Sequence, residues 1–250
     1  MNWNSIMGFI STTALFLPVV FILTFRLAGY RSFPALLFYY FLVFVYNLFT
    51  EGYLRVSPQV PHYWGLVNNV LDTPLMLLFL TYFSTSPAFT RRLRIIILFF
   101  LAFEIAIIGW KGLTIDAVTI IMAPGLATVL YFCFHFFIRQ TRITIMHHKA
   151  TGKAFIISAL LFAYGCYALI YLFYYILKLP DTANTFLIYF FVTTFSSLLL
   201  CAGILIERKR VQKLSELKIT RKELSSLYKE SKPAPSFKKV VLDFDKEQWN

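Results

Sequence analysis

The feature that most constrains the fold is a set of long apolar segments separated by short polar connections. Each is close to the roughly 20 residues that a helix needs to cross a bilayer. With 58% hydrophobic and 14% charged residues, the 250-residue chain is too apolar for an ordinary water-soluble domain. The sequence therefore predicts an all-α, polytopic membrane protein with seven transmembrane helices, at residues 6–25, 33–53, 62–83, 95–110, 115–138, 154–177 and 185–206.

The basic residues indicate how these helices are oriented. Of the 24 lysines and arginines, 21 fall in the first, third and fifth connections and in the C-terminal tail. Because basic residues are retained on the cytoplasmic side, we expect the N-terminus outside and the C-terminus in the cytoplasm. The same distribution supports the short span at 95–110, without which the basic connections would lie on both sides. We expect a multi-pass protein of the plasma (cytoplasmic) membrane.

The tail differs in composition from the membrane domain. We expect a seven-helix transmembrane domain over 1–206, a basic cytoplasmic helix over 207–232 and a flexible C-terminal peptide over 233–250. The basic helix follows the last span without any glycine or proline, and its apolar residues recur at three-to-four spacing. Such a helix is suited either to lie on anionic lipid or to dock on a protein partner or a second copy of the chain.

An aspartate lies near the middle of the third span. Asp72 is four residues from Asn68 and three from Asn69, so a helix places the three side chains roughly on one face. A carboxyl group at membrane depth is costly unless it is paired, protonated or set in a water-filled cavity, so it marks a candidate functional site. No lysine or arginine within the spans is available to pair with it.

Further polar residues are expected at a similar depth on neighbouring spans. Asn47 and Glu51 lie in the outer part of the second helix, Glu104 lies in the outer half of the fourth, and Tyr171 belongs to a row of tyrosines on the sixth. The alternative is that these groups bond to one another between helices and only fix the packing. The leading interpretation is a ligand-binding pocket that opens to the outside, formed by Asp72, Asn68, Asn69, Glu51, Asn47, Glu104 and Tyr171.

Motifs for metal or cofactor chemistry are missing. His135 is the one histidine well inside a span, whereas a catalytic zinc site usually takes three protein ligands. The seventh span has no lysine for a retinal Schiff base, and the chain has no phosphate-binding glycine loop or serine elbow. We therefore expect no metal and no cofactor, and we assign no catalytic residue.

Three functions fit these features, and the leading hypothesis is a receptor-like sensor. It would bind a small molecule in the outward pocket and signal through the C-terminal helix to a cytoplasmic protein partner or a homodimer. The alternatives are an intramembrane lipid-directed enzyme, less favoured, in which Asp72 and Glu104 form a carboxylate pair, and a small proton- or cation-coupled transporter component. The arrangement resembles the seven-helix sensory modules of some bacterial signalling proteins, in architecture alone. The expected partners include membrane lipid but no nucleic acid.

Overall fold

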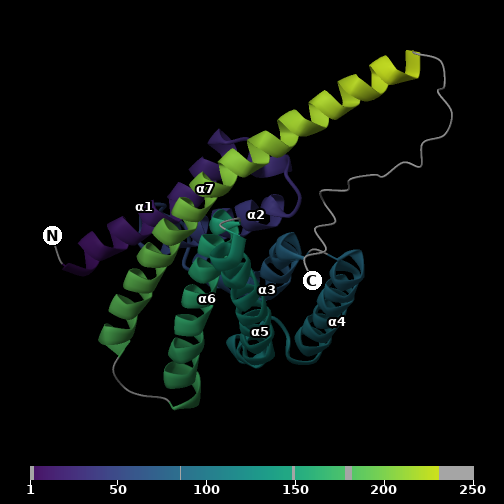
Figure 1. Ribbon diagram of the computed structural model, residues 1–250. Helices are drawn as coiled ribbons and strands as arrows, with labels where there is room; N and C mark the ends of the chain where they lie inside the picture. The colour runs from purple at the N-terminus through teal and green to yellow at the C-terminus, as the bar shows by residue number, and fades with distance from the viewer. Residues whose placement is uncertain (1–2, 85, 148–149, 178–181, 231–250) are drawn as a thin grey trace.

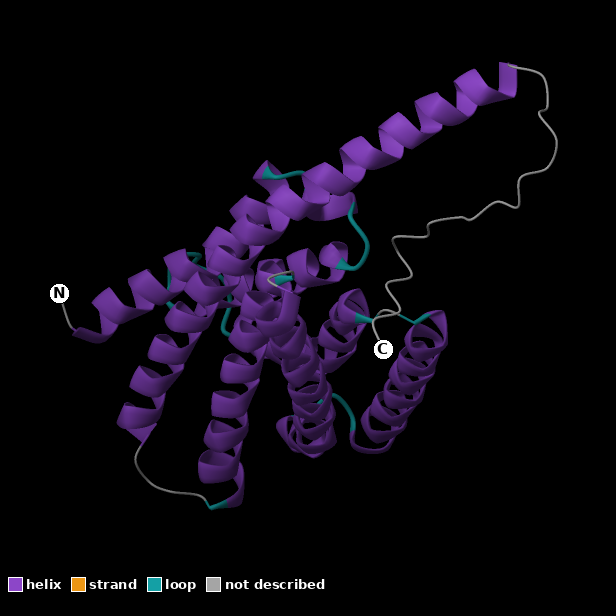
Figure 2. Ribbon diagram, in the orientation of Figure 1, coloured by secondary structure: helices purple, strands orange, loops and turns teal. Residues whose placement is uncertain are grey.

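The computed structural model describes residues 3–84, 86–147, 150–177 and 182–230. Within these ranges the chain is helical apart from short connections, with no strand (Figure 2). Seven of its described helices are long and apolar enough to cross a membrane. This confirms the predicted all-α fold and matches the predicted number of membrane-length helices. They are α1 (Trp3–Thr24), α2 (Phe33–Thr50), α3 (Gln59–Leu80), α4 (Pro87–Lys111), α5 (Ile115–His147), α6 (Thr151–Tyr171) and α7 (Thr182–Glu230).

Proline and glycine set several helix ends. Proline lies in the first turn of α2 and of α4, where its missing N–H costs no helical hydrogen bond. Gly112 ends α4 with a φ of 73°, a left-handed value that glycine adopts without strain. Two helices change pitch at their last turn: α3 continues as a 3₁₀ turn over Thr81–Phe83, and α6 as a π-helical turn over Leu172–Ile176.

The helices form one bundle in which α3 packs against α2, α4 and α5, and α7 packs against α1 and α6. Helix α4 stands at the edge of the bundle in Figure 1, where it contacts only α3 and α5 closely. We call the end that carries the α1–α2, α3–α4 and α5–α6 connections the basic end, because those connections hold most of the loop lysines and arginines. Glu51 and the α4–α5 connection lie at the opposite end.

The backbones of α6 and α7 approach each other closely at two glycines. A methyl group on Gly203 would lie 2.8 Å from the Ile156 backbone nitrogen and 3.1 Å from the Gly152 carbonyl oxygen. One on Gly152 would lie 2.7 Å from the backbone nitrogen of Glu207. Small residues allow such close backbone approach between membrane helices, so α6 and the middle of α7 are held together as one unit.

Five large, almost fully buried aromatic side chains gather toward the basic end. Phe33, Phe79, Tyr82, Phe83 and Phe136 are each 2% exposed or less. The Tyr82 ring packs edge to face on Phe33 and Phe83, with centroids 5.1 and 5.3 Å apart, an arrangement that aromatic pairs favour. This aromatic core fixes the positions of α2, α3 and α5 at the basic end.

Helix α7 continues well beyond the bundle (Figure 1). Its residues from Glu207 to Glu230 are helical, in the region where the sequence predicts the basic helix. Val211 still packs against the core, whereas Leu217 and Leu224 are 56% and 46% exposed. The flexible peptide expected over 233–250 lies outside the described residues.

Candidate functional site

Asp72 is joined to a neighbouring helix by a hydrogen bond. The Tyr164 hydroxyl on α6 donates to its Oδ1 atom at 2.5 Å, and the Tyr39 side chain on α2 also contacts the Asp72 carboxyl group. Tyr164 is 1% exposed, so the bond lies inside the bundle. The aspartate expected to need a partner at membrane depth therefore has neutral phenols as partners.

The tyrosines of α6 extend this polar cluster toward two further helices. The Tyr167 hydroxyl lies 3.3 Å from Thr193 Oγ1 on α7, and the rings of Tyr167 and Tyr189 have centroids 6.0 Å apart. The Tyr171 hydroxyl donates to the Thr119 carbonyl oxygen on α5 at 2.9 Å. Tyr171 was predicted to contact a ligand; in the structure its hydroxyl bonds the backbone of a neighbouring helix.

Glu104 is the most unusual member of the predicted set. It is 1% exposed, and both of its carboxyl oxygens are buried without a hydrogen-bond partner among the described residues. The Oδ1 atom of Asn68 is buried and unpartnered in the same sense. Asp72 is close enough to Glu104 to interact with it electrostatically. The two acids predicted as a pair thus share one region between α3 and α4.

The other three predicted residues are not gathered around Asp72 and Glu104. Asn47 is buried and its side-chain amide donates to the Val43 carbonyl oxygen of its own helix at 2.9 Å. Glu51 is half-buried against Gly8 of α1. Asn69 is exposed, whereas Asn68 and Asp72 on the same helix are half-buried.

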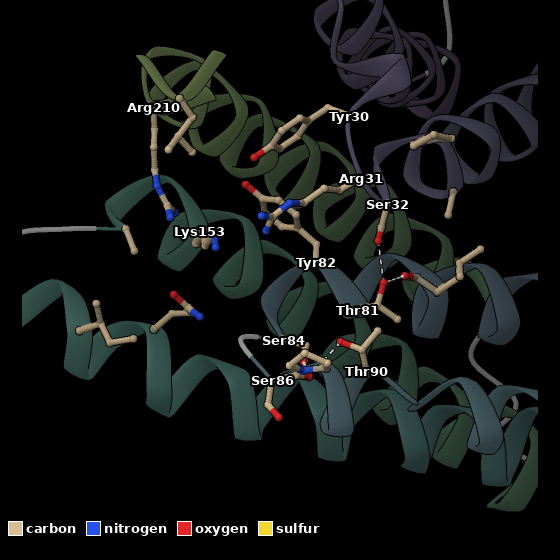
Figure 3. A pocket seen from close by; sticks show the side chains of 18 of the residues that line it. Tyr30, Arg31, Ser32, Thr81, Tyr82, Ser84, Ser86, Thr90, Lys153 and Arg210 are labelled. Atoms are coloured by element: carbon tan, nitrogen blue, oxygen red, sulfur yellow. Dashed lines mark hydrogen bonds between the residues drawn. The ribbon is translucent and has the colours of Figure 1, made fainter. Parts of the chain in front are cut away.

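A cavity of about 1050 Å³ that the sequence does not predict lies at the basic end (Figure 3). Its lining includes neither Asp72 nor Glu104, and neither does that of a smaller hollow beside Trp64 at the opposite end. The sequence signal for it was the recurrence of arginine and lysine in three connections and on α7. Membrane topology predicts the same distribution of charge, so the sequence does not distinguish the two.

The chemistry open to the interior cluster is that of acids and phenols. No group of three His, Cys, Asp or Glu side chains able to hold a metal ion occurs within the described ranges. What the cluster offers is hydrogen bonding, and a carboxyl group without a partner beside a second, bonded one. Comparison with protein families, curated proteins and solved structures finds no match for this chain.

Proposed function

We propose that the protein is a membrane signalling module in which the polar cluster around Asp72 acts on α7. In this proposal α7 carries the change to a protein partner at the basic end, the side that the distribution of lysine and arginine assigns to the cytoplasm. The observation that carries the proposal is that one unbroken helix, Thr182–Glu230, both contacts the tyrosine cluster and extends beyond the bundle.

The contacts supply a path from Asp72 to this helix. Tyr164 bonds Asp72, its ring lies 6.1 Å from that of Tyr167, and Tyr167 faces Thr193 of α7. The Tyr167–Thr193 distance of 3.3 Å is long for a bond between hydroxyl groups. This contact is weak, so in the proposal a movement of Tyr164 reaches α7 mainly through the close packing of α6 on α7.

Rigid packing then turns a small movement into a movement of the whole helix. Gly152 and Gly203 bring the α6 and α7 backbones into contact near the basic end. Four residues after Gly203 on α7, Glu207 is 2% exposed and accepts hydrogen bonds from Tyr82 and Arg210. Packed elements shift between discrete arrangements and do not deform continuously. In this proposal α7 therefore moves as a rigid body.

The proposal is tested by replacing Asp72 and measuring α7 at a distance. Asp72→Asn keeps the side-chain shape but removes the charge, and hydrogen exchange of residues 212–226 would be compared with that of the wild-type chain in phosphatidylcholine nanodiscs. We expect a change in protection of this segment. The control, Asp116→Asn, removes an exposed carboxyl group at the opposite end of the bundle and should leave the segment unchanged. Equal protection in all three proteins would refute the proposal.

A second candidate is the lipid-directed enzyme with Asp72 and Glu104 as an acid and base pair. It is favoured by one observation, the two unpartnered oxygens of Glu104 in a buried position near Asp72. It requires turnover: the purified chain in liposomes of mixed phospholipids should yield a new lipid product, detected by mass spectrometry, and Glu104→Gln should abolish it. Product formation that is unchanged in Glu104→Gln, or absent from the wild type, excludes this candidate.

A further inference from the structure

The cavity at the basic end is built by segments far apart in the sequence. The α1–α2 connection contributes Tyr30 and Arg31, the α3–α4 connection contributes Ser84 and Ser86, and the ends of α5, α6 and α7 complete it. Figure 3 shows Arg31, Tyr82, Lys153 and Arg210 gathered on one side of this space. A site assembled from five places in one chain is a property of the fold and not of one basic loop.

The charge of the lining is one-sided. Six basic side chains line the cavity: Arg31, Arg94, Lys153, Arg210, Lys213 and Arg221. None of the described lining residues is acidic. The adjacent acid is Glu207, which receives hydrogen bonds from Tyr82 and, at 3.3 Å, from Arg210. The lining described by the structure is therefore basic, with one carboxyl group beside it.

Membrane topology alone accounts for basic residues at this end, but not for how they are arranged. Basic side chains at helix ends usually extend outward to water and headgroups. Lys153 is instead 8% exposed, with its Nζ atom 4.8 Å from the centre of the Tyr82 ring. Gln140, also in the lining, is 2% exposed. Polar groups turned inward toward a cavity are typical of a binding site.

Hydroxyl groups complete the polar part of the lining, and one wall is apolar. The hydroxyl oxygens of Ser32 and Thr81 lie 2.6 Å apart, and the Ser84 hydroxyl donates to the Ser86 carbonyl oxygen at 3.0 Å. These hydrogen bonds hold the side chains in place. Leu78, Ile143 and Leu214 supply an apolar surface beside them. The Ser32, Thr81 and Ser84 hydroxyl protons are donated within the protein. Lysine and arginine are the donors in this lining that proteins use to bind phosphate.

We propose that this cavity binds the phosphate group of an anionic ligand. The ligand comes either from the bilayer, as a phospholipid headgroup whose body lies along the apolar wall, or from solution, as a soluble phosphorylated molecule. The inference rests on the cavity alone and does not depend on the signalling role of Asp72.

Two pairs of substitutions separate a defined site from diffuse charge. Arg94→Gln with Lys213→Gln removes two exposed cations that line the cavity. Arg92→Gln with Lys209→Gln removes two exposed cations from the same two helices, outside the lining. Both double variants lose the same charge, and none of the four side chains is buried, so both should fold.

The experiment uses the full chain and two phosphate probes. Inorganic pyrophosphate is titrated by calorimetry into the protein in phosphatidylcholine nanodiscs, and retention of phosphatidylglycerol against phosphatidylcholine is measured by native mass spectrometry. We expect the cavity variant to lose about tenfold or more in affinity or retention, since two charge-assisted contacts are removed. The control variant should stay within about twofold of wild type, because exposed charges outside the site are screened by salt.

Each outcome has a definite meaning. Cavity-dependent binding of pyrophosphate supports a soluble ligand, and cavity-dependent retention of phosphatidylglycerol supports a lipid headgroup. Equal losses in the two double variants would show diffuse electrostatic attraction and overturn the proposal, as would a wild-type chain that binds neither probe. Because these measurements do not involve Asp72, they stand or fall apart from the hydrogen-exchange test.

Discussion

The Tyr164 hydroxyl donates to the Asp72 carboxyl group at 2.5 Å, joining α6 to α3 across 92 positions of sequence. An acid at membrane depth needs a partner, and no lysine or arginine lies within the expected spans. The structure meets this need with a phenol. A neutral donor leaves the acid free to change its protonation state without breaking an ion pair, which is why this bond is central to the proposed signalling role.

Removing the phenol tests how much this bond contributes to stability. Tyr164→Phe leaves the ring in the core but takes the donor from Asp72, so we expect the free energy of unfolding to fall by about 1–3 kcal/mol. The measurement is a sodium dodecyl sulfate titration in mixed micelles. Tyr131→Phe is the matched control, because Tyr131 is 66% exposed. Removing its hydroxyl group should leave the midpoint of the unfolding titration unchanged. Equal midpoints for all three proteins would show that the bond contributes nothing.

Replacing Glu104 should raise the free energy of unfolding, because its carboxyl group has no hydrogen-bond partner among the described residues. Burying a polar group without a hydrogen bond costs about 1–3 kcal/mol by mutational data, and both Glu104 oxygens are in that position. We expect Glu104→Leu to raise the free energy of unfolding by a similar amount in the same titration. Glu104→Gln keeps a polar group at this position, so its free energy of unfolding should rise by less than that of Glu104→Leu. A less stable Leu variant would mean that the carboxyl group is satisfied in the native protein.

These two acids illustrate what the sequence determines and what it does not. The apolar runs place seven helices in the observed order because length and hydrophobicity are local properties, and they place Asp72 and Glu104 inside the bundle. Rotation about the helix axis is different, since it depends on packing with several neighbours. Asn69 is more exposed than Asn68 and Asp72 on the same helix, and the spacing of the tyrosines does not single out Tyr164 as the partner of Asp72.

The same reasoning explains the differences at helix ends and at the basic cavity. The fourth span was expected to begin at residue 95, but α4 begins at Pro87, because Arg91, Arg92 and Arg94 lie on a helical turn at the end of the span and lower only its hydropathy. The cavity requires three connections and α7 to be placed relative to one another. No single stretch of sequence carries that information.

Gly203 tests the close packing of α6 on α7. A Cβ atom there would lie 2.7 Å from Ile156 Cγ1 and 2.8 Å from the Ile156 nitrogen, and a backbone atom in a helix has little freedom to move away. We expect Gly203→Ala to lower the free energy of unfolding by about 1–3 kcal/mol. Gly165→Ala is the control: nothing lies within 4 Å of that position, so it should be neutral or stabilising by up to about 1 kcal/mol. Equal effects would mean that α7 adjusts freely on α6.

The partly buried carboxyl group of Glu51 should make the stability of the protein depend on pH. It follows the last residue of α2, just beyond the membrane span, and its carboxyl group packs so closely on Gly8 that a Cβ atom there would collide with it. Partial burial raises the pKa of Glu51 above its usual value. The folded protein then holds this proton more tightly than the unfolded chain, so stability is greatest below the unfolded pKa. It declines as pH rises from about 4 through the raised folded pKa.

Glu51→Gln isolates this contribution, because an amide of the same shape does not titrate. We expect the decline in unfolding midpoint between pH 4 and the folded pKa to become shallower in Glu51→Gln, measured by the same titration at a series of pH values. Asp116→Asn removes an exposed carboxyl group from the same end of the bundle and should leave the decline as it is in the wild type. A decline that is equally steep in Glu51→Gln would place its origin in another group, because the only titrating proton removed by this change is that of Glu51.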